Sequence, residues 1–255
     1  MKEFEEVYKL HYDDVYRFLY RLCGHNHHLA EELTRYYTQH HRTDGLIMFG
    51  SERGFPQNSK TVGIQITEKE PQNVGVSVSH VLEGALEQAL RYLQAKGHTK
   101  IAYVGEAFTE GKKSLLQKKM REFGMEIHPE WIYTSRMRFE DAGRDGVRQL
   151  LQGKERPTAV FGAYGYITQG ILQELESEGL EVPRDISVIS MDHDPKPLHP
   201  SMKVSYITSG TEETCAQIME FLKERLGSSE PNVPCKQIRV ELSFHEGETI
   251  RDLTK

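Results

Sequence analysis

Residues 157–194 have the sequence PTAVFGAYGYITQGILQELESEGLEVPRDISVISMDHD. Two short runs of apolar and β-branched residues, 159–161 and 186–189, flank an amphipathic segment at 167–178. Gly179 follows that segment directly and is a typical helix stop. The order of these segments predicts a strand, a helix and a second strand, which together form the right-handed βαβ unit of a parallel sheet.

The carboxyl ends of these two strands carry polar side chains. Tyr164 follows the first predicted strand, and Asp192 follows the second. Open parallel sheets bind ligands in the crevice at the carboxyl ends of their strands. We therefore expect Tyr164 and Asp192 to lie at a ligand-binding edge of the sheet.

Helical and extended hydrophobic patterns alternate along most of the remaining chain. The predicted strands are 45–49, 62–66, 74–78, 101–104, 131–134, 204–207 and 238–244. The predicted helices are 4–22, 28–41, 82–95, 113–123, 140–151 and 211–226. Repeated alternation of this kind is typical of an α/β fold, and we expect most of the strands to be parallel.

The composition limits the class of protein. The 255-residue chain has a formal net charge of −6 and no cluster of Lys and Arg, which argues against a nucleic-acid-binding surface. Its three cysteines are an odd number without CxxC spacing, so we expect reduced thiols rather than a disulfide framework. No apolar run approaches the roughly 20 residues of a membrane helix, and the amino terminus is acidic. These features predict a cytoplasmic protein without membrane contact.

The motifs of common catalytic and cofactor sites are missing from the sequence. It contains no GxSxG nucleophile elbow, no P-loop and no GxGxxG turn. A group of histidines lacks Cys, Asp or Glu at metal-ligand spacing: His25, His27, His28, His40 and His41. We therefore predict no catalytic residues, no metal site and no cofactor, and thus a protein that is not an enzyme.

Six segments of the sequence occur in an order and at a spacing that, taken together, are specific to one family of proteins. They are TDGLIMFG (43–50), EGALEQALRYLQAKGHTKIAYVGE (83–106), PTAVFGAYGYITQG (157–170), GLEVPRDISVISMD (179–192), LHPSMKVSYI (198–207) and RVELSFHEGETI (239–250). From residue 44 onward, this set resembles the effector-binding core of the LacI/GalR family of bacterial transcription regulators. The resemblance implies a type I periplasmic-binding-protein-like fold, with two Rossmann-like lobes, parallel sheets and three chain crossings between the lobes. It also implies a small-molecule effector, commonly a sugar, in the cleft.

The amino-terminal segment departs from that family. The helix-turn-helix expected before residue 44 is missing, and so is the first strand–helix–strand of the amino-terminal lobe. We therefore expect this lobe to be incomplete and preceded by helices. Residues 4–34, FEEVYKLHYDDVYRFLYRLCGHNHHLAEELT, instead resemble region 2 of extracytoplasmic-function sigma factors. The chain is thus interpreted as a chimera with these parts: a helical fragment at 1–34, a truncated amino-terminal lobe at 35–77 and 196–227, and a carboxyl-terminal lobe at 78–195 and 236–255.

The resemblance also implies four effector-binding residues. Asp192 matches a position where the family has a carboxylate, which can accept two hydrogen bonds from sugar hydroxyls. Tyr164 lies where the family has the Asn of an Asn-Asp pair, Lys112 where it has an Arg, and His80 where it commonly has an Asp. A structural role stays open for each of the four: a backbone contact for Asp192, lobe packing for Tyr164, solvent exposure for Lys112 and a helix cap for His80.

These observations predict the non-enzymatic, effector-binding core of a LacI-type regulator. We expect a carbohydrate effector, a homodimer, and no direct sequence-specific DNA binding by this chain. One alternative is a structural or interaction protein with a dead cleft, which the lost Asn-Asp pair favours. Another is a sigma factor fragment that binds RNA polymerase. Sugars that raise the melting temperature would separate the first prediction from the structural protein, and a pull-down with core RNA polymerase would test the sigma factor fragment.

Overall fold

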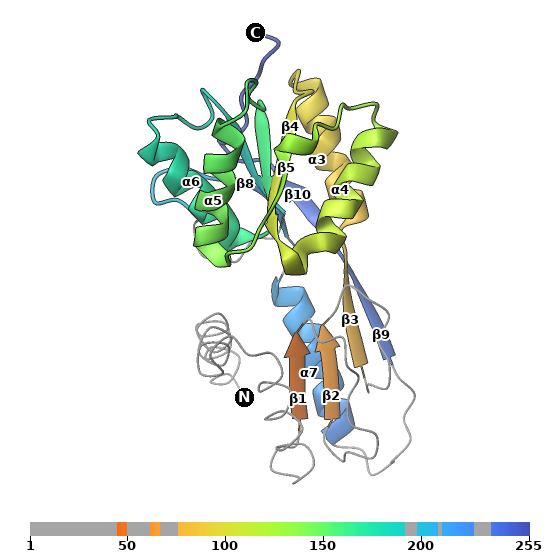
Figure 1. Cartoon of the computed structure of the whole chain (residues 1–255). Coiled ribbons are helices and arrows are strands. Elements are labelled where there is room, and N and C mark those ends of the chain that lie inside the picture. The colour runs from red at the N-terminus through yellow and green to blue at the C-terminus, as the bar shows by residue number, and fades with distance from the viewer. Residues whose placement is uncertain (1–44, 50–61, 67–75, 192–197, 209–210, 227–235) are drawn as a thin grey trace. The chain divides into compact units, whose positions relative to one another are not determined.

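The computed structural model describes residues 45–49, 62–66, 76–191, 198–208, 211–226 and 236–255 (Figure 1). The chain divides into two compact units, Met1–Ser79 with Ile218–Ile238 and His80–Gln217 with Arg239–Lys255. It therefore passes from one unit to the other three times, within β3 (Val76–Val81), α7 (Thr211–Leu226) and β9 (Lys236–Glu241). Three crossings are what the sequence predicts.

The first unit contains a four-stranded sheet in the order β1-β2-β3-β9. β1 (Gly45–Phe49) pairs in parallel with β2 (Val62–Ile66), and β2 pairs in parallel with β3. The predicted bounds of β1, β2 and α7 are confirmed. In the part of α7 that belongs to this unit, Ile218 and Phe221 are buried.

The second unit contains a six-stranded sheet in the order β10-β8-β7-β6-β4-β5. Its strands are β4 (Ile101–Glu106), β5 (Ile132–Ser135), β6 (Ala159–Gly162), β7 (Ser187–Ser190), β8 (Ser205–Thr208) and β10 (Ser243–His245). All neighbouring pairs are parallel except β8 with β10. The fold is therefore α/β and periplasmic-binding-protein-like, as the sequence predicts.

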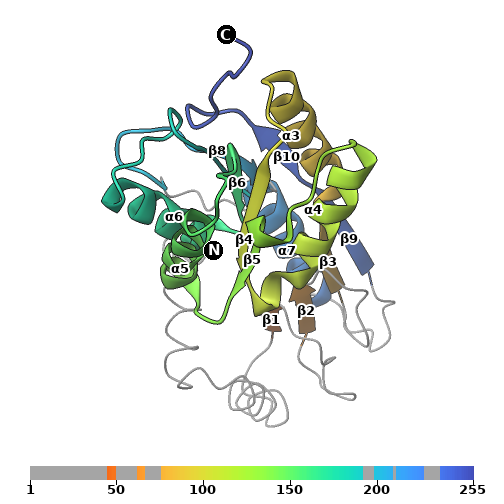
Figure 2. The same ribbon diagram turned by 45° about the horizontal axis from the view of Figure 1, so that its top comes forward.

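Helices cover both faces of this six-stranded sheet (Figures 1 and 2). They are α3 (Glu83–Ala95), α4 (Glu110–Glu122), α5 (Phe139–Leu151) and α6 (Gly165–Ser177). α3 packs against α4, and α5 packs closely against α6 on the other side of the strands. α4 and α5 lie on opposite faces because both crossovers are right-handed but run in opposite directions along the sheet. The chain moves from β4 to β5 in one direction, and then from β5 back past β4 to β6 in the other.

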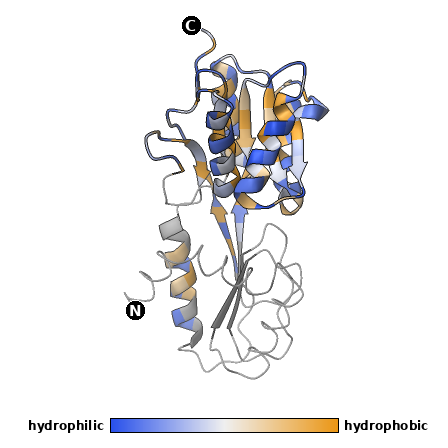
Figure 3. Ribbon diagram, turned by 60° about the vertical axis from the view of Figure 1, so that its left-hand side comes forward, coloured by the Kyte–Doolittle hydropathy of each residue, from blue (hydrophilic) through white to orange (hydrophobic). Residues whose placement is uncertain are grey.

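The core of the second unit lies between the sheet and its helices. All six residues of β4 are buried, as are all four of β6 and all four of β7. Strands that are covered by helices on both faces bury every side chain instead of alternate ones. Figure 3 shows the resulting hydrophobic colouring of the strands, whereas the helices carry both kinds of residue. Burial of each Leu, Ile or Phe contributes about 1.5–3 kcal/mol to folding.

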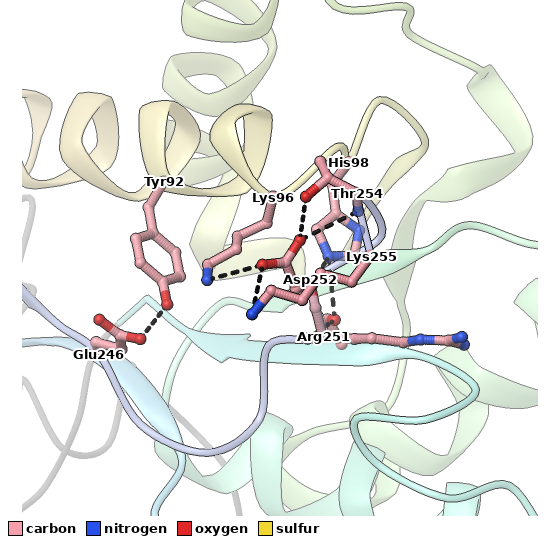
Figure 4. A network of polar contacts seen from close by, with 9 residues as sticks. Tyr92, Lys96, His98, Glu246, Arg251, Asp252, Thr254 and Lys255 are labelled. Atoms are coloured by element: carbon pink, nitrogen blue, oxygen red, sulfur yellow. Dashed lines mark hydrogen bonds and ion pairs between the residues drawn. The ribbon is translucent and has the colours of Figure 1, made fainter.

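The carboxyl-terminal segment is fixed to the second unit by polar contacts (Figure 4). Tyr92 in α3 donates a hydrogen bond to Glu246, and Lys96 forms an ion pair of 3.2 Å with Asp252. Burial and the nearby Glu246 carboxylate raise the pKa of Tyr92 to about 12. Deeper in the unit, the Thr249 hydroxyl donates to the Val188 carbonyl oxygen, at 2.6 Å. The last residues of the chain are therefore part of the folded unit.

The sequence prediction is wrong about the last strand. A single strand is predicted over 238–244, but the structure has β9 and β10, which belong to different sheets. The alternation of side chains continues through the break, since Ile238 and Val240 are buried and Leu242 is half-buried. Where the chain changes sheet, the Leu242 amide donates to the Val81 carbonyl oxygen, at 3.1 Å. Hydrophobic periodicity reports burial but does not identify the sheet that provides it.

The predicted assignment of 196–227 to the amino-terminal lobe also needs correction. β8, at the centre of that segment, belongs to the six-stranded sheet, where Ile189 of β7 pairs with Ser205. The Ser205 amide also donates to the Thr249 hydroxyl oxygen, at 2.8 Å. These contacts hold β8 in the second unit, and the boundary between the units lies inside α7.

Some predictions lie outside the described residues. These are the helices at 4–22 and 28–41, the resemblance of 4–34 to sigma factors, and the side chain of Asp192. They stay predictions.

Candidate functional site

The carboxyl ends of β4 and β6 form the topological switch point of the six-stranded sheet. β4 has β5 on one side and β6 on the other, so the connections leaving these strands diverge in opposite directions. Divergence of this kind opens a crevice at the strand ends, which is the usual ligand-binding position in an open α/β sheet. Glu106 is the last residue of β4, and Tyr164 is the second residue after β6. Arg138 precedes α5 in the segment that follows β5.

A buried ion pair lies at this switch point. The Nε atom of Arg138 lies 2.6 Å from Oε2 of Glu106, and the side chains are 21% and 2% exposed. Burial raises the pKa of the Glu106 carboxyl above its ordinary value, while the charge of Arg138 and a hydrogen bond from Tyr164 act in the opposite direction. Burial, together with the Glu106 charge, also raises the pKa of the Tyr164 hydroxyl. Tyr164 therefore keeps its proton at neutral pH.

Aromatic rings surround the Arg138 guanidinium. Its central carbon lies 4.7 Å from the centroid of the Phe108 ring and 5.0 Å from that of Phe139. Phe139 in turn meets Tyr166 edge to face, with the ring centroids 5.9 Å apart. Phe108 is 63% exposed. Ring faces of this kind stack against flat ligands, and the guanidinium edge donates hydrogen bonds.

The backbone around Arg138 has an unusual conformation. Arg138 itself is extended, and Phe139, the first residue of α5, has a φ of 57°. A bulky residue in this left-handed region costs on the order of 1–3 kcal/mol. The ion pair with Glu106 and the ring contact with Tyr166 are among the interactions that stabilise this turn.

The structure brings two of the four predicted effector-binding residues to this edge. Lys112, in the first turn of α4, donates from Nζ to the Ala163 carbonyl oxygen, at 3.1 Å, and Ala163 directly precedes Tyr164. His80 is half-buried and lies in β3, a strand of the four-stranded sheet. Asp192 lies outside the described residues, although it comes just after β7, the neighbour of β6.

Glu106, Arg138 and Phe108 are not among the four residues that the sequence predicts for the site. One signal was available: Glu106 is a charged residue at the end of the run 101–106, which is otherwise apolar or Gly and lies within a matching segment. A carboxylate at the carboxyl end of a buried parallel strand indicates a ligand-binding edge. No comparable signal identifies Arg138, because its role depends on how the turn before α5 folds back toward β4.

Within the part of the chain that the structure describes, no group of three or more His, Cys, Asp and Glu side chains could hold a metal ion. Among the same residues, no helix combines the length and the apolar character needed to cross a membrane.

The sequence matches the family model of the periplasmic binding protein-like domain over residues 90–250. The ribose operon repressor of Haemophilus influenzae is 25% identical over 204 residues, which are 76% of this chain and 60% of the repressor. The HTH-type transcriptional repressor PurR of Glaesserella parasuis is 30% identical over 165 residues, which are 60% of this chain and 47% of that protein. The chain thus spans about half the length of these relatives.

Solved structures show the same fold. A LacI family transcriptional regulator from Enterococcus faecium with bound ribose superposes with a TM-score of 0.72 at 17% identity, covering 86% of this chain and 84% of the regulator. A LacI family transcriptional regulator from Lactobacillus casei with bound sucrose has a TM-score of 0.70 at 19% identity, with coverage of 86% and 84%.

Proposed function

The chain belongs to the periplasmic binding protein-like domain family, and from this premise we propose that it is the effector-binding core of a LacI-type bacterial transcription regulator. The observation that carries the proposal is the group of Glu106, Arg138 and Tyr164 at the switch point of the six-stranded sheet. Two repressors among the relatives support the regulatory role. A carbohydrate as effector, a homodimer and a cytoplasmic location are parts of the proposal that rest on family resemblance.

The proposed role of the site is binding without chemistry. Arg138 donates hydrogen bonds to effector hydroxyls, and the ring of Phe108, which is 63% exposed, packs on the effector ring. Binding carries a signal only if the effector has different affinities for two arrangements of the chain, because equal affinities shift no population. Asp192, Lys112 and His80 stay proposed as further effector-binding residues.

The test is a thermal-shift screen against monosaccharides and disaccharides, beginning with ribose, sucrose and cellobiose, followed by calorimetry. A sugar that binds only the folded chain stabilises it by about 2.7 kcal/mol at 100 times its dissociation constant. Arg138→Ala should then weaken binding by about 1.5–3 kcal/mol, the range for a hydrogen bond to a charged group. A panel in which no sugar changes the melting temperature contradicts the proposal in its carbohydrate form.

A matched control is available in α3. Arg91 lies over the Phe123 ring at 5.0 Å and 4.0 Å from the Glu87 carboxylate, so it has the same kinds of partner as Arg138. It is exposed on α3, which precedes the amino end of β4, whereas the switch point lies at the carboxyl end of that strand. Arg91→Ala should leave sugar affinity unchanged. Equal losses in the two variants would show that loss of an arginine, and not the switch-point site, is responsible.

A further inference from the structure

The charge of Arg138 is already matched by a carboxylate of the same chain. A guanidinium that binds a phosphate or carboxylate ligand offers its fork of N–H groups to the ligand oxygens. Here, Nε of Arg138 lies 2.6 Å from Glu106, which is 2% exposed and thus little screened by water. A second anion brought to Arg138 would lie beside this buried carboxylate, and like charges in contact strongly disfavour binding.

The helix termini around the switch point also carry acidic side chains. Helix amino termini favour anions, but the first turn of α4 contains Glu110, and the first turn of α5 contains Glu140 and Asp141. Lys113, which could otherwise attract a phosphate, lies 2.6 Å from the Glu110 carboxylate. The first turn of α6 has no acidic residue. Lys112, in the first turn of α4, is a further cation at this edge, and its Nζ donates to the Ala163 carbonyl oxygen, at 3.1 Å.

We propose that the effector at this edge is an unphosphorylated carbohydrate, and that Glu106 sets this specificity by neutralising Arg138. The inference rests on the proposed function and deepens it by excluding sugar phosphates. Arg138 still donates hydrogen bonds to hydroxyls, since neutralisation removes its net charge but not its N–H groups. The ring of Phe108 contacts the apolar face of the sugar. Glu106 therefore acts behind Arg138 as a specificity-determining residue.

The first experiment uses the wild-type chain and matched pairs of probes. Calorimetry compares D-ribose with D-ribose 5-phosphate, D-glucose with D-glucose 6-phosphate, and D-fructose with D-fructose 6-phosphate. For the pair that binds, we expect the sugar to bind at least about tenfold more tightly than its phosphate ester. Tighter binding of the ester overturns this inference and leaves the effector-binding role intact. Absence of binding by either member of every pair, and by the sugars of the wider screen, overturns both.

The second experiment tests Glu106 directly. Glu106→Gln keeps the size of the side chain and leaves the Arg138 charge unmatched, so the preference for sugar over ester should fall by about tenfold or more. The control is Glu155→Gln, which makes the same charge change at an exposed carboxylate 2.7 Å from Lys100, before the amino end of β4. Its preference should equal that of the wild type. An unchanged preference in folded Glu106→Gln overturns the role of Glu106, and the wild-type comparison decides the ligand class even if this variant does not fold.

Discussion

His98 joins segments of the second unit that lie far apart in the sequence. Its Nε2 lies 2.9 Å from the Arg251 carbonyl oxygen (Figure 4). Its Nδ1 lies 2.8 Å from the Thr158 hydroxyl. The side chain is completely buried between these partners. Burial lowers the pKa of His98 below its ordinary value of 6.5, although the bond to Arg251 acts in the opposite direction. The imidazole is therefore neutral in the folded chain at neutral pH.

The lowered pKa of His98 predicts a loss of stability in mild acid. Below about pH 6.5 the unfolded chain takes up a proton at His98, but the folded chain does so only at lower pH, so the stability contributed by the neutral imidazole falls as the pH falls. Urea denaturation from pH 7.5 to pH 5 should show a smaller decline for His98→Gln than for the wild type. Thr158→Val is the control, because it removes the bond to Nδ1 but keeps the titrating ring, and it should retain the wild-type slope. Parallel curves for wild type and His98→Gln would contradict the prediction.

At the residue scale, the sequence predicts which side chains end the strands but not which of them meet. Tyr164 and Lys112 were found through neighbouring glycines and family resemblance, and the structure places both at the edge of the sheet. Arg138 was not found, because it reaches Glu106 through a turn in which Phe139 has a positive φ. A bulky aromatic residue is rarely expected in that region, so no local propensity predicts the turn.

At the scale of elements, α5 and α6 show how two glycines set a helix contact. A Cβ atom on Gly143 would overlap the Ile167 carbonyl oxygen, and one on Gly170 would overlap the Glu140 carbonyl oxygen. The backbones of the two helices therefore approach each other directly. This contact fixes α5, whose amino terminus follows Arg138, against α6, whose amino terminus follows Tyr164.

Substitution of the contact glycines should destabilise the second unit. Gly143→Ala or Gly170→Ala forces the helices apart, and we expect a loss of about 1–3 kcal/mol in the free energy of unfolding, as in overpacked cores. The better helix propensity of Ala offsets at most about 1 kcal/mol. Gly84→Ala in α3 is the control, since no atom lies within 4 Å of its added Cβ, and it should be neutral or stabilising. Urea titrations give the comparison, and equal stability of all three variants would contradict close helix contact.

Helices and strands could be predicted where a single spacing of hydrophobic residues, either helical or extended, persists between two turn signals. The helices and strands from 83 to 190 appear in the predicted order, with ends that shift by a few residues. The prediction failed for two features that depend on contacts between distant parts of the sequence. Sheet membership of β8, and the division of 238–244 between β9 and β10, depend on hydrogen bonds to segments that are distant in the sequence. Hydrophobic patterns cannot carry that information.

At the scale of the whole molecule, each unit has its own sheet. The described strands of the first are hydrogen-bonded in the order β1-β2-β3-β9, and those of the second in the order β10-β8-β7-β6-β4-β5. The chain links the units through β3, α7 and β9 only. Chains that consist of two such units commonly depart from two-state unfolding, because each unit can lose its structure separately.

Unfolding of the second unit can be followed by itself, because the chain has a single tryptophan, Trp131. This side chain is 1% exposed and lies in the second unit, where η2 (Pro129–Trp131) leads into β5. Far-ultraviolet circular dichroism, in contrast, reports the helices and strands of both units.

We expect a first loss of dichroism without any change in Trp131 fluorescence, followed by a second loss that coincides with exposure of the indole. Gly143→Ala should move only the second transition to lower temperature, since Gly143 lies in the same unit as Trp131. If dichroism and fluorescence trace a single coincident curve in both proteins, the two units unfold as one, and their separation into independent cooperative units is wrong.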